Sequence, residues 1–344
     1  MTHSPTPIRL PMNRPVPRPY RGGAGIERFR RQPPSGEEWA PEDFLASTVT
    51  TFGSAEEGLT RIDGTFLREL IQNDPIGFLG AEHVAWFGPD PKLLCKLLHT
   101  GERLFVHAHP DAEFARRELG APTGKTEAWI ILDVDETEAG AAWLGFAEDV
   151  SAERLAGWFE TQDSAAMLAA MNRVELRRGD TLFVPAGVPH AIGAGVLLLE
   201  LQEPADLSVI VEYAPFPRLS REDGLLGLDA ATALSSIDRT AFSGERMGAA
   251  IGALPAARSG ALFGADAEPF FRAEAFAVEP GTPTELRPQF AVLVVTDGEG
   301  SLEWAGGSLG AAAGDTVLVP HGAGGLRLAG ELAGIRCMPP APAA

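Results

Sequence analysis

Short apolar runs in the middle of the chain alternate with turn residues. Between Arg103 and Tyr213, runs rich in β-branched and aromatic residues are bounded by Gly, Pro or Asp, a pattern that predicts strands. These runs read RLFVHAH, TEAWIILDV, TLFVPAG, GVLLLELQ and LSVIVEY. The same texture returns from about Phe270, as FFRAEAFAV, FAVLVVTDG, GSLEWAGG, DTVLVP and LRLAG. Many short strands separated by Gly-rich turns indicate a β-barrel or a β-sandwich.

Three segments carry a helical pattern instead. Residues 65–79 place apolar side chains three and four positions apart, with Thr65 as the expected N-cap. Residues 152–171 are rich in Ala with a helical spacing of large apolar residues, and a third helix is expected around 224–237. The run PKLLCKLL at 91–98 fits either a strand or a helix. Residues 1–36 contain eight prolines, so we expect an extended arm there.

A weak internal repeat suggests the domain organisation. GDTLFVPAG at 179–187 resembles GDTVLVPHG at 314–322, and two copies of one strand-and-turn unit suggest duplicated β modules. We therefore expect a mainly β protein with two β-barrel modules, a helical insertion and a helical connecting segment. The expected parts are an extended arm (1–36), a first module (37–215) with the insertion near 150–172, a helical connection (216–267) and a second module (268–344).

The charge balance narrows the classes of partner. The 344 residues include 28 basic and 47 acidic side chains, for a formal net charge of −19. This chain lacks the basic footprint of a nucleic-acid-binding protein, and an anionic membrane surface would repel it. No apolar run reaches the length of a membrane span or forms a signal-peptide core, and the two cysteines exclude a disulfide framework. We expect a cytoplasmic protein with a small-molecule partner.

Two histidines alternate within RLFVHAH. His107 and His109 lie two positions apart, so a strand would point both imidazoles to one face. Glu127 belongs to the next predicted strand, and His190 follows a third in GDTLFVPAGVPH. Three neighbouring strands would then direct these four side chains to one point. Neutral imidazoles with one carboxylate suit zinc, iron, manganese or nickel, so the set predicts a metal site.

The turn before His190 fits the pattern G-x5-P-x-G-x2-H, which is similar to the second cupin motif. Together with other segments it resembles the class I mannose-6-phosphate isomerase (phosphomannose isomerase) family of the cupin superfamily. The matching segments are TFLRELIQNDP (65–75), LLCKLL (93–98), HAHPD (107–111), GKTEAW (124–129), PAGVPHAIG (185–193) and LELQ (199–202). The resemblance covers about residues 35–213 and implies two cupin modules. The second would be degenerate, because Gly325 stands at the position of His190.

The resemblance implies a metal-dependent aldose–ketose isomerase, which would interconvert mannose 6-phosphate and fructose 6-phosphate. By position, the family's metal ligands fall on His107, His109, Glu127 and His190. We expect Zn²⁺ there, with another divalent transition metal as the alternative. The family's active-site lysines fall on Lys96 and Lys125, and Glu200 is an unusual acidic residue between leucines. Lys125, Lys96 and Glu200 are therefore the candidates for moving the proton.

Several positions depart from the family pattern. The first ligand is His107, where the family usually has Gln, and the Asp after K-L-L is His99. The active-site Arg that follows L-E-I-Q falls on Ile210, which supplies neither a charge nor hydrogen-bond donors. Arg218 or Arg103 could replace that guanidinium in space.

These departures leave three alternatives open. The loss of the Arg allows a different or unphosphorylated sugar as substrate. A site of three histidines and one glutamate also suits iron-dependent cupin dioxygenases. A non-catalytic sugar-binding cupin could retain the metal for structure alone. These classes differ in behaviour: an isomerase converts its sugar without oxygen, a dioxygenase consumes oxygen, and a binding protein shows affinity without turnover.

Overall fold

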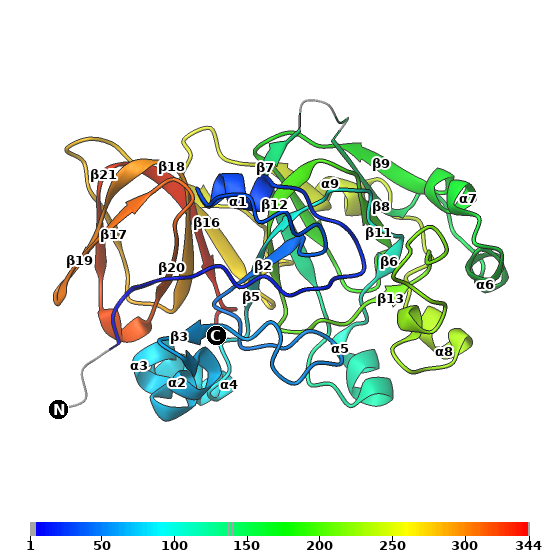
Figure 1. The fold of residues 1–344 in the computed structure, drawn as a ribbon, viewed down its shortest axis with the longest axis horizontal. Helices are drawn as coiled ribbons and strands as arrows, with labels where there is room; N and C mark the ends of the chain where they lie inside the picture. The colour runs from blue at the N-terminus through cyan, green and yellow to red at the C-terminus, as the bar shows by residue number, and fades with distance from the viewer. Residues whose placement is uncertain (1–4, 136–137, 139, 343–344) are drawn as a thin grey trace.

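The computed structural model describes residues 5–135, 138 and 140–342, and strands dominate its architecture (Figure 1). Three main antiparallel sheets and one small hairpin make up the β structure, as the sequence predicts for a mainly β protein. In the described part of the chain the hydrogen-bonded strand order leaves every sheet open. The sheets therefore face one another as layers, and the closed barrels expected from the sequence are not observed.

The central layer is a six-stranded sheet. Its order is β14 (Ile251–Ala253), β10 (Asp180–Val184), β7 (Glu127–Val134), β12 (Val196–Gln202), β5 (Leu94–His99) and β2 (Glu42–Leu45). Strands β7, β12 and β5 read as nearly continuous apolar runs because both faces of this sheet are covered. The sequence of residues 91–98 fits either a strand or a helix, and in the structure most of these residues form β5.

A five-stranded sheet covers one face of the central sheet. Its order is β13 (Val209–Ile210), β6 (His107–Ala108), β11 (His190–Ile192), β8 (Ala141–Phe146) and β9 (Met171–Glu175). Trp129 and Leu198 of the central sheet share a core with Leu144 and Ile192 of this one. The two sheets thus enclose the space toward which the candidate site residues point.

An eight-stranded sheet covers the opposite face. It contains β1 (Ile8–Arg9), β20 (Thr316–Val319), β18 (Ala291–Trp304), β21 (Leu326–Met338), β16 (Arg272–Val278), β15 (Gly260–Ala261), β17 (Thr284–Leu286) and β19 (Gly307–Ala312). Leu197, Leu199 and Leu201 of β12 pack into its core, whereas Val196 and Leu198 face the five-stranded sheet. The side chain of Glu200 therefore shares the face of Leu198.

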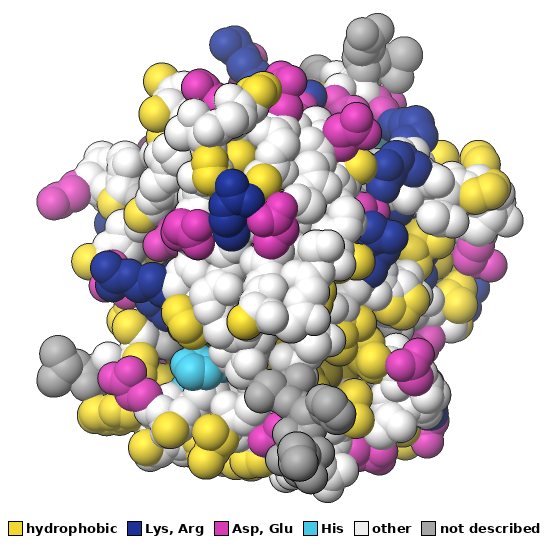
Figure 2. Space-filling view, turned by 90° about the vertical axis from the view of Figure 1, so that its left-hand side faces the viewer, with side chains coloured by type: hydrophobic (Ala, Val, Ile, Leu, Met, Phe, Trp, Pro, Cys, Tyr) yellow, Lys and Arg dark blue, Asp and Glu magenta, His cyan; other side chains and the backbone are white. Residues whose placement is uncertain are grey.

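The outer side of the eight-stranded sheet carries charges of both signs. Figure 2 shows this end of the molecule, with cationic and acidic groups interspersed among hydrophobic ones. Arg327, for example, lies 2.6 Å from Glu303. This mixture agrees with the absence of a basic footprint in the sequence.

The helices are short and lie outside the sheets. They are α1 (Gly25–Phe29), α2 (Leu67–Asn73), α3 (Pro75–Leu79), α4 (Ala81–Phe87), α5 (Ala112–Phe114), α6 (Ala152–Thr161), α7 (Ser164–Ala169), α8 (Ala230–Leu234) and α9 (Glu245–Ala250). A π-helix spans Ala115–Leu119, and 3₁₀ turns span Asp223–Leu225 and His321–Ala323. No described helix has both the length and the apolar character needed to cross a membrane.

The helix expected over residues 65–79 is divided in two. Asp74 ends α2 and caps α3, because its carboxylate accepts a hydrogen bond of 3.0 Å from the Gly77 amide. The expected cap Thr65 lies instead in β4 (Thr65–Phe66), which pairs with β3 (Arg61–Ile62). The helical pattern was correct, but the predicted N-cap was wrong.

The proline-rich arm packs against the sheets. Within residues 1–36, where the sequence predicts only extended chain, β1 pairs with β20 and α1 forms a short helix. The Nδ1 atom of buried His99 accepts hydrogen bonds from the amides of Gly23 (3.1 Å) and Gly25 (3.3 Å). A Cβ atom at either glycine would lie 2.4 Å from this ring, so the contact requires glycine at both positions. His99 therefore fixes the arm on the central sheet.

Candidate active site

Three imidazoles meet between the two facing sheets. His107 in β6 and His190 in β11 are direct partners across the strands, and His109 follows β6 by one position. All three side chains are buried, and their candidate ligand nitrogens lie within 4.8 Å of one another. The ring centroids of His107 and His190 are 4.1 Å apart. The fold thus brings together the three histidines singled out in the sequence.

Backbone carbonyls fix the tautomer of each ring. The Nδ1-to-oxygen distances are 3.0 Å from His107 to Phe105, 2.7 Å from His109 to Leu207 and 2.9 Å from His190 to Val188. Each carbonyl accepts the Nδ1–H, which leaves Nε2 as the ligand atom of a neutral ring. Burial and then His190 lower the pKa of His107 well below its usual value, and burial and then Lys125 lower that of His109 to about 3.

Glu127 approaches these rings from the opposite sheet. It is the first residue of β7, and its carboxylate lies 3.0 Å from His109 Nε2 and 3.3 Å from His190 Nε2. The indole of Trp129 donates a hydrogen bond of 2.9 Å to the same carboxylate. The expectation of three neighbouring strands was wrong, because β6 and β11 are neighbours while β7 belongs to the facing sheet.

The donor set fits a divalent metal ion. The Nε2 atom of His190 is buried and has no hydrogen-bond partner among residues 5–135, 138 and 140–342. A buried polar atom of this kind is expected where a ligand binds. Three neutral imidazole nitrogens and one carboxylate are suitable ligands for a transition metal. His107, His109, His190 and Glu127 could therefore hold such an ion.

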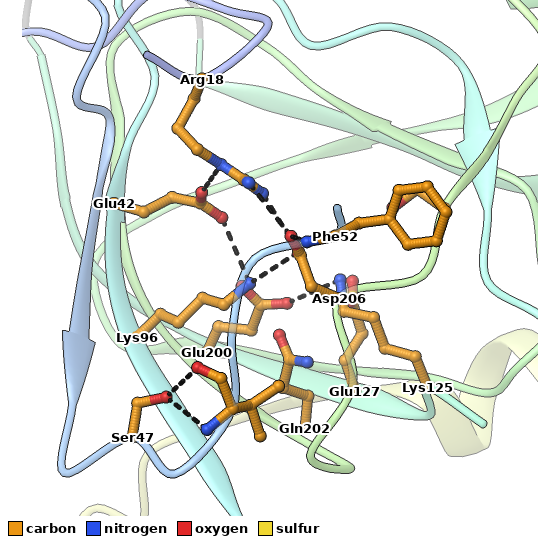
Figure 3. Close-up of polar contacts among 12 residues, drawn as sticks. Arg18, Glu42, Ser47, Phe52, Lys96, Lys125, Glu127, Glu200, Gln202 and Asp206 are labelled. Carbon is orange, nitrogen blue, oxygen red and sulfur yellow. Dashed lines mark hydrogen bonds and ion pairs between the residues drawn. The ribbon is translucent and has the colours of Figure 1, made fainter. Parts of the chain in front are cut away.

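Lys125 and Glu200 lie beside Glu127 (Figure 3). The ammonium group of Lys125 lies 2.9 Å from Glu127, 2.9 Å from His109 Nε2 and 3.4 Å from Glu200. Burial lowers the pKa of Lys125, but Glu127 and Glu200 outweigh it and hold that pKa above its usual value. Burial, opposed by Lys125, raises the pKa of Glu200 to about 8. The two groups thus form a buried pair in which the lysine keeps its proton.

A second buried cluster adjoins the first (Figure 3). Lys96 lies 3.2 Å from Glu42 and 3.8 Å from Asp206. The guanidinium of Arg18 donates two hydrogen bonds to Asp206, of 3.0 and 3.1 Å, and also pairs with Glu42. Burial raises the pKa of Asp206, but Arg18 and Lys96 outweigh it and hold that pKa well below its usual range. These four side chains neutralise one another inside the fold.

Arg18 and Asp206 were not recognised as site residues from the sequence. Arg18 comes from the proline-rich arm, between Pro17 and Pro19, where no periodicity indicates which side chains turn inward. Asp206 lies in the stretch after LELQ, in which the family pattern singles out the position of Ile210 instead. Asp206 also accepts a hydrogen bond of 3.0 Å from the Phe52 amide, so it joins the arm, β5 and the loop after β2.

A cleft of about 500 Å³ opens onto both clusters. Six of the seven predicted site residues line it: Lys96, His107, Lys125, Glu127, His190 and Glu200. His109 completes the histidine cluster behind them. Ile210 and Arg218 line the cleft as well, whereas Arg103 does not. Arg103 binds Glu212 through two hydrogen bonds of 2.7 and 2.6 Å, so it is committed elsewhere.

Comparison with known proteins agrees with this geometry. The mannose-6-phosphate isomerase of Streptococcus mutans is 35% identical to the chain over 136 residues, which are 38% of this chain and 41% of that protein. The chain is a relative of the mannose-6-phosphate isomerases. The alignments with this and three further curated relatives cover between 34% and 54% of those proteins' lengths. No family model matches the chain.

Solved mannose 6-phosphate isomerases share the fold along nearly the whole chain. The Bacillus subtilis enzyme superposes with a TM-score of 0.71 at 19% identity, covering 97% of this chain and 99% of that one. A zinc-bound mannose 6-phosphate isomerase superposes with a TM-score of 0.73 at 15% identity, covering 98% and 100%. The layered sheets are therefore those of a mannose-6-phosphate isomerase fold.

Proposed function

We propose that this protein is a metal-dependent aldose–ketose isomerase that interconverts mannose 6-phosphate and fructose 6-phosphate. The observation that carries the proposal is the joining of His107, His109, His190 and Glu127 with Lys125 and Glu200 in one cleft. The curated relatives carry the same activity in their names. The substrate is accordingly a small sugar phosphate.

Zn²⁺ is the proposed metal, since a relative in fold is a zinc-bound enzyme and the four donors suit this ion. His107, His109, His190 and Glu127 would hold it. When bound, a divalent ion of this kind polarises the carbonyl and hydroxyl oxygens of an open-chain sugar. The second contact of each ring, from Nδ1 to a backbone carbonyl, keeps the Nε2 atoms oriented toward the cleft.

Glu200 is the proposed proton carrier between C1 and C2. Its side chain lies on the cleft face of β12, in ion-pair contact with Lys125. The carboxylate would take the proton from C2 of the open-chain aldose and return it to C1 of an enediol-type intermediate, while the hydroxyl proton of O2 passes to O1, so that the overall change is an isomerisation. Lys125 keeps its proton, so its role is to stabilise the negative charge that develops on the sugar oxygens. Lys96, held by Glu42 and Asp206, would position the sugar.

The two β units are proposed to be cupin modules. Residues 37–215 would form the metal-binding module with its helical insertion, and residues 268–344 would form the degenerate module. Residues 216–267 would be the helical connection between the two modules, and residues 1–36 would be the arm that precedes them. α6 and α7 lie in the proposed insertion and α8 and α9 in the connection, which supports this division. Cys95 and Cys337 are free and buried, which fits the proposed cytoplasmic location.

A coupled assay tests the proposal. Purified protein is supplied with mannose 6-phosphate as isolated, after chelation, and after Zn²⁺ is restored, and fructose 6-phosphate is measured. Turnover that disappears with the metal and returns with Zn²⁺ is the expected result. A folded, zinc-loaded protein without turnover would overturn the proposal. Parallel samples would then identify the alternative. Turnover of mannose would indicate an unphosphorylated substrate, oxygen uptake at an electrode would indicate oxygen chemistry, and neither would indicate binding alone.

A further inference from the structure

The cationic side chains of the cleft differ in how many carboxylates each one contacts. Four cationic side chains line the cleft, and Arg18, Lys96 and Lys125 each contact two carboxylates. The fourth is Arg218, which makes no ion pair with a carboxylate in the described part of the chain. Its guanidinium carbon lies instead 4.8 Å from the centroid of the Trp39 ring.

The position of Arg218 is built into the fold. It lies in the second of two successive turns, in which the Phe216 amide donates to the Tyr213 carbonyl (3.0 Å) and the Leu219 amide donates to the Phe216 carbonyl (3.0 Å). Buried Phe216 packs edge-on against Phe105, with ring centroids 5.4 Å apart. These contacts hold the turns at the cleft, while the Arg218 side chain remains exposed to solvent.

The charge of the cleft makes an unpaired cation necessary for an anionic substrate. Seven carboxyl side chains line the cleft against four cations. A phosphate dianion that bound Arg18 would compete with Asp206 and leave a buried carboxylate without its partner, which is strongly unfavourable. An exposed guanidinium can instead bind two phosphate oxygens at once without breaking a protein ion pair.

We propose that Arg218, held over Trp39, binds the phosphate group of the sugar phosphate and sets the preference for phosphorylated over unphosphorylated hexose. The inference rests on the proposed function, because it assigns the phosphate subsite of the same cleft. Ile210 supplies no charge there, and Arg103 is bound to Glu212 outside the cleft. Arg218 is therefore a specificity-determining residue that is not part of the histidine cluster.

The test compares Arg218→Met with a matched control, Arg221→Met. Arg221 lies three residues later, is also partly exposed and also covers an aromatic ring, 4.9 Å from the centroid of Phe159. It pairs with Glu160 and does not line the cleft. Calorimetric titration of the zinc-loaded proteins with mannose 6-phosphate and with mannose gives the affinities, and steady-state assays give kcat and KM.

Arg218→Met is expected to weaken mannose 6-phosphate binding by about tenfold or more, the range for one charged hydrogen-bonded contact. Mannose binding and kcat should change less than about twofold, and Arg221→Met should match the wild type for both sugars. An equal loss for both sugars, or an unchanged affinity for mannose 6-phosphate, would overturn the inference.

The same data separate this inference from the proposed function. If wild-type protein binds mannose 6-phosphate through Arg218 but converts neither sugar, the isomerase proposal fails and the phosphate subsite stands. If the wild type converts mannose 6-phosphate and Arg218→Met has the same KM, the activity stands and the subsite is wrong. Circular dichroism confirms that the compared variants are folded.

Discussion

Glu200 and Lys96 are direct cross-strand partners in β12 and β5, yet their charged groups belong to different clusters. The Glu200 carboxylate lies 3.4 Å from Lys125, beside the histidines, whereas the Lys96 ammonium lies 3.2 Å from Glu42. This cross-strand pair thus links the part of the cleft proposed to transfer the proton to the charge network formed by Lys96, Glu42, Asp206 and Arg18. The face of β12 toward the five-stranded sheet therefore carries the proposed proton carrier, while Leu197, Leu199 and Leu201 on the other face pack in the core.

Glu200→Gln tests the proton-transfer role. The amide keeps the size of the side chain but cannot accept a proton, so kcat should fall by about 10²- to 10⁴-fold. Zinc content, measured by elemental analysis, should equal that of the wild type, because Glu200 is not among the four proposed ligands. A variant that retains wild-type kcat would assign the proton to another group.

Leu199→Ala tests the opposite face of the same strand. Leu199 is fully buried in the core between the central and eight-stranded sheets. The truncation should lower the free energy of unfolding by about 2–5 kcal/mol, as for other buried leucines. The variant should bind Zn²⁺ with unchanged stoichiometry at a temperature where it is folded. Denaturant titration and elemental analysis together check this separation of stability from metal binding.

His109→Ala tests the metal centre itself. Loss of one ligand should reduce bound Zn²⁺ well below one equivalent, and turnover should fall with it. His321→Ala is the control, because His321 lies in a 3₁₀ turn outside the cluster. In the wild type, Zn²⁺ at about 100 times its Kd should stabilise the fold by about 2.7 kcal/mol relative to metal-free protein. Equal zinc content in His109→Ala and the wild type would show that the ligand set is wrong.

Asp206→Asn tests the charge network through the pH dependence of stability. The pKa of Asp206 is lowered in the folded state, since Arg18 and Lys96 outweigh burial. Its contribution to stability is therefore fully present above its unfolded pKa of about 4, and is lost as the pH falls below that value. The wild type should lose stability more steeply than Asp206→Asn below pH 4.

At neutral pH the Asp206→Asn variant should be less stable by about 3 kcal/mol, because Arg18 and Lys96 lose a buried partner. Glu56→Gln removes one member of an exposed pair with Arg61 and should change stability by less than about 1 kcal/mol. Denaturation curves between pH 2.5 and 7 measure both effects. Parallel curves for the wild type and Asp206→Asn would contradict the assigned role of this carboxylate.

The sequence predicted the parts of the site that follow a local rule. His107 and His109 share a face because they lie two positions apart, and the turn pattern ending at His190 is specific. The strands β7 and β12 were recognised because their apolar runs are bounded by turn residues. Short-range pattern therefore predicted the histidines, Glu127 and Glu200 together with the strands that carry them, whereas Lys125 was identified through the resemblance to the isomerase family.

The rest depends on contacts between distant segments. Arg18 reaches Asp206 across 188 positions, and its segment has no periodicity that could indicate an inward side chain. Whether Arg103 or Arg218 remains available in the cleft depends on distant pairing, because the Glu212 carboxylate binds Arg103. The closed barrels expected from the sequence are not observed, because the pattern of apolar and turn residues does not show whether the two edge strands of a sheet pair with each other. Pairing across the fold, which no local pattern contains, decided each of these points.

The most direct test follows the reaction in D₂O by proton NMR, without oxygen. Zinc-loaded protein is incubated with fructose 6-phosphate, and the resonances of mannose 6-phosphate are observed as they form. Mannose 6-phosphate is expected to appear with deuterium at C2, because Glu200 would exchange its proton with solvent during transfer. Folded, zinc-loaded protein that forms no aldose under these conditions would contradict the proposed isomerase activity.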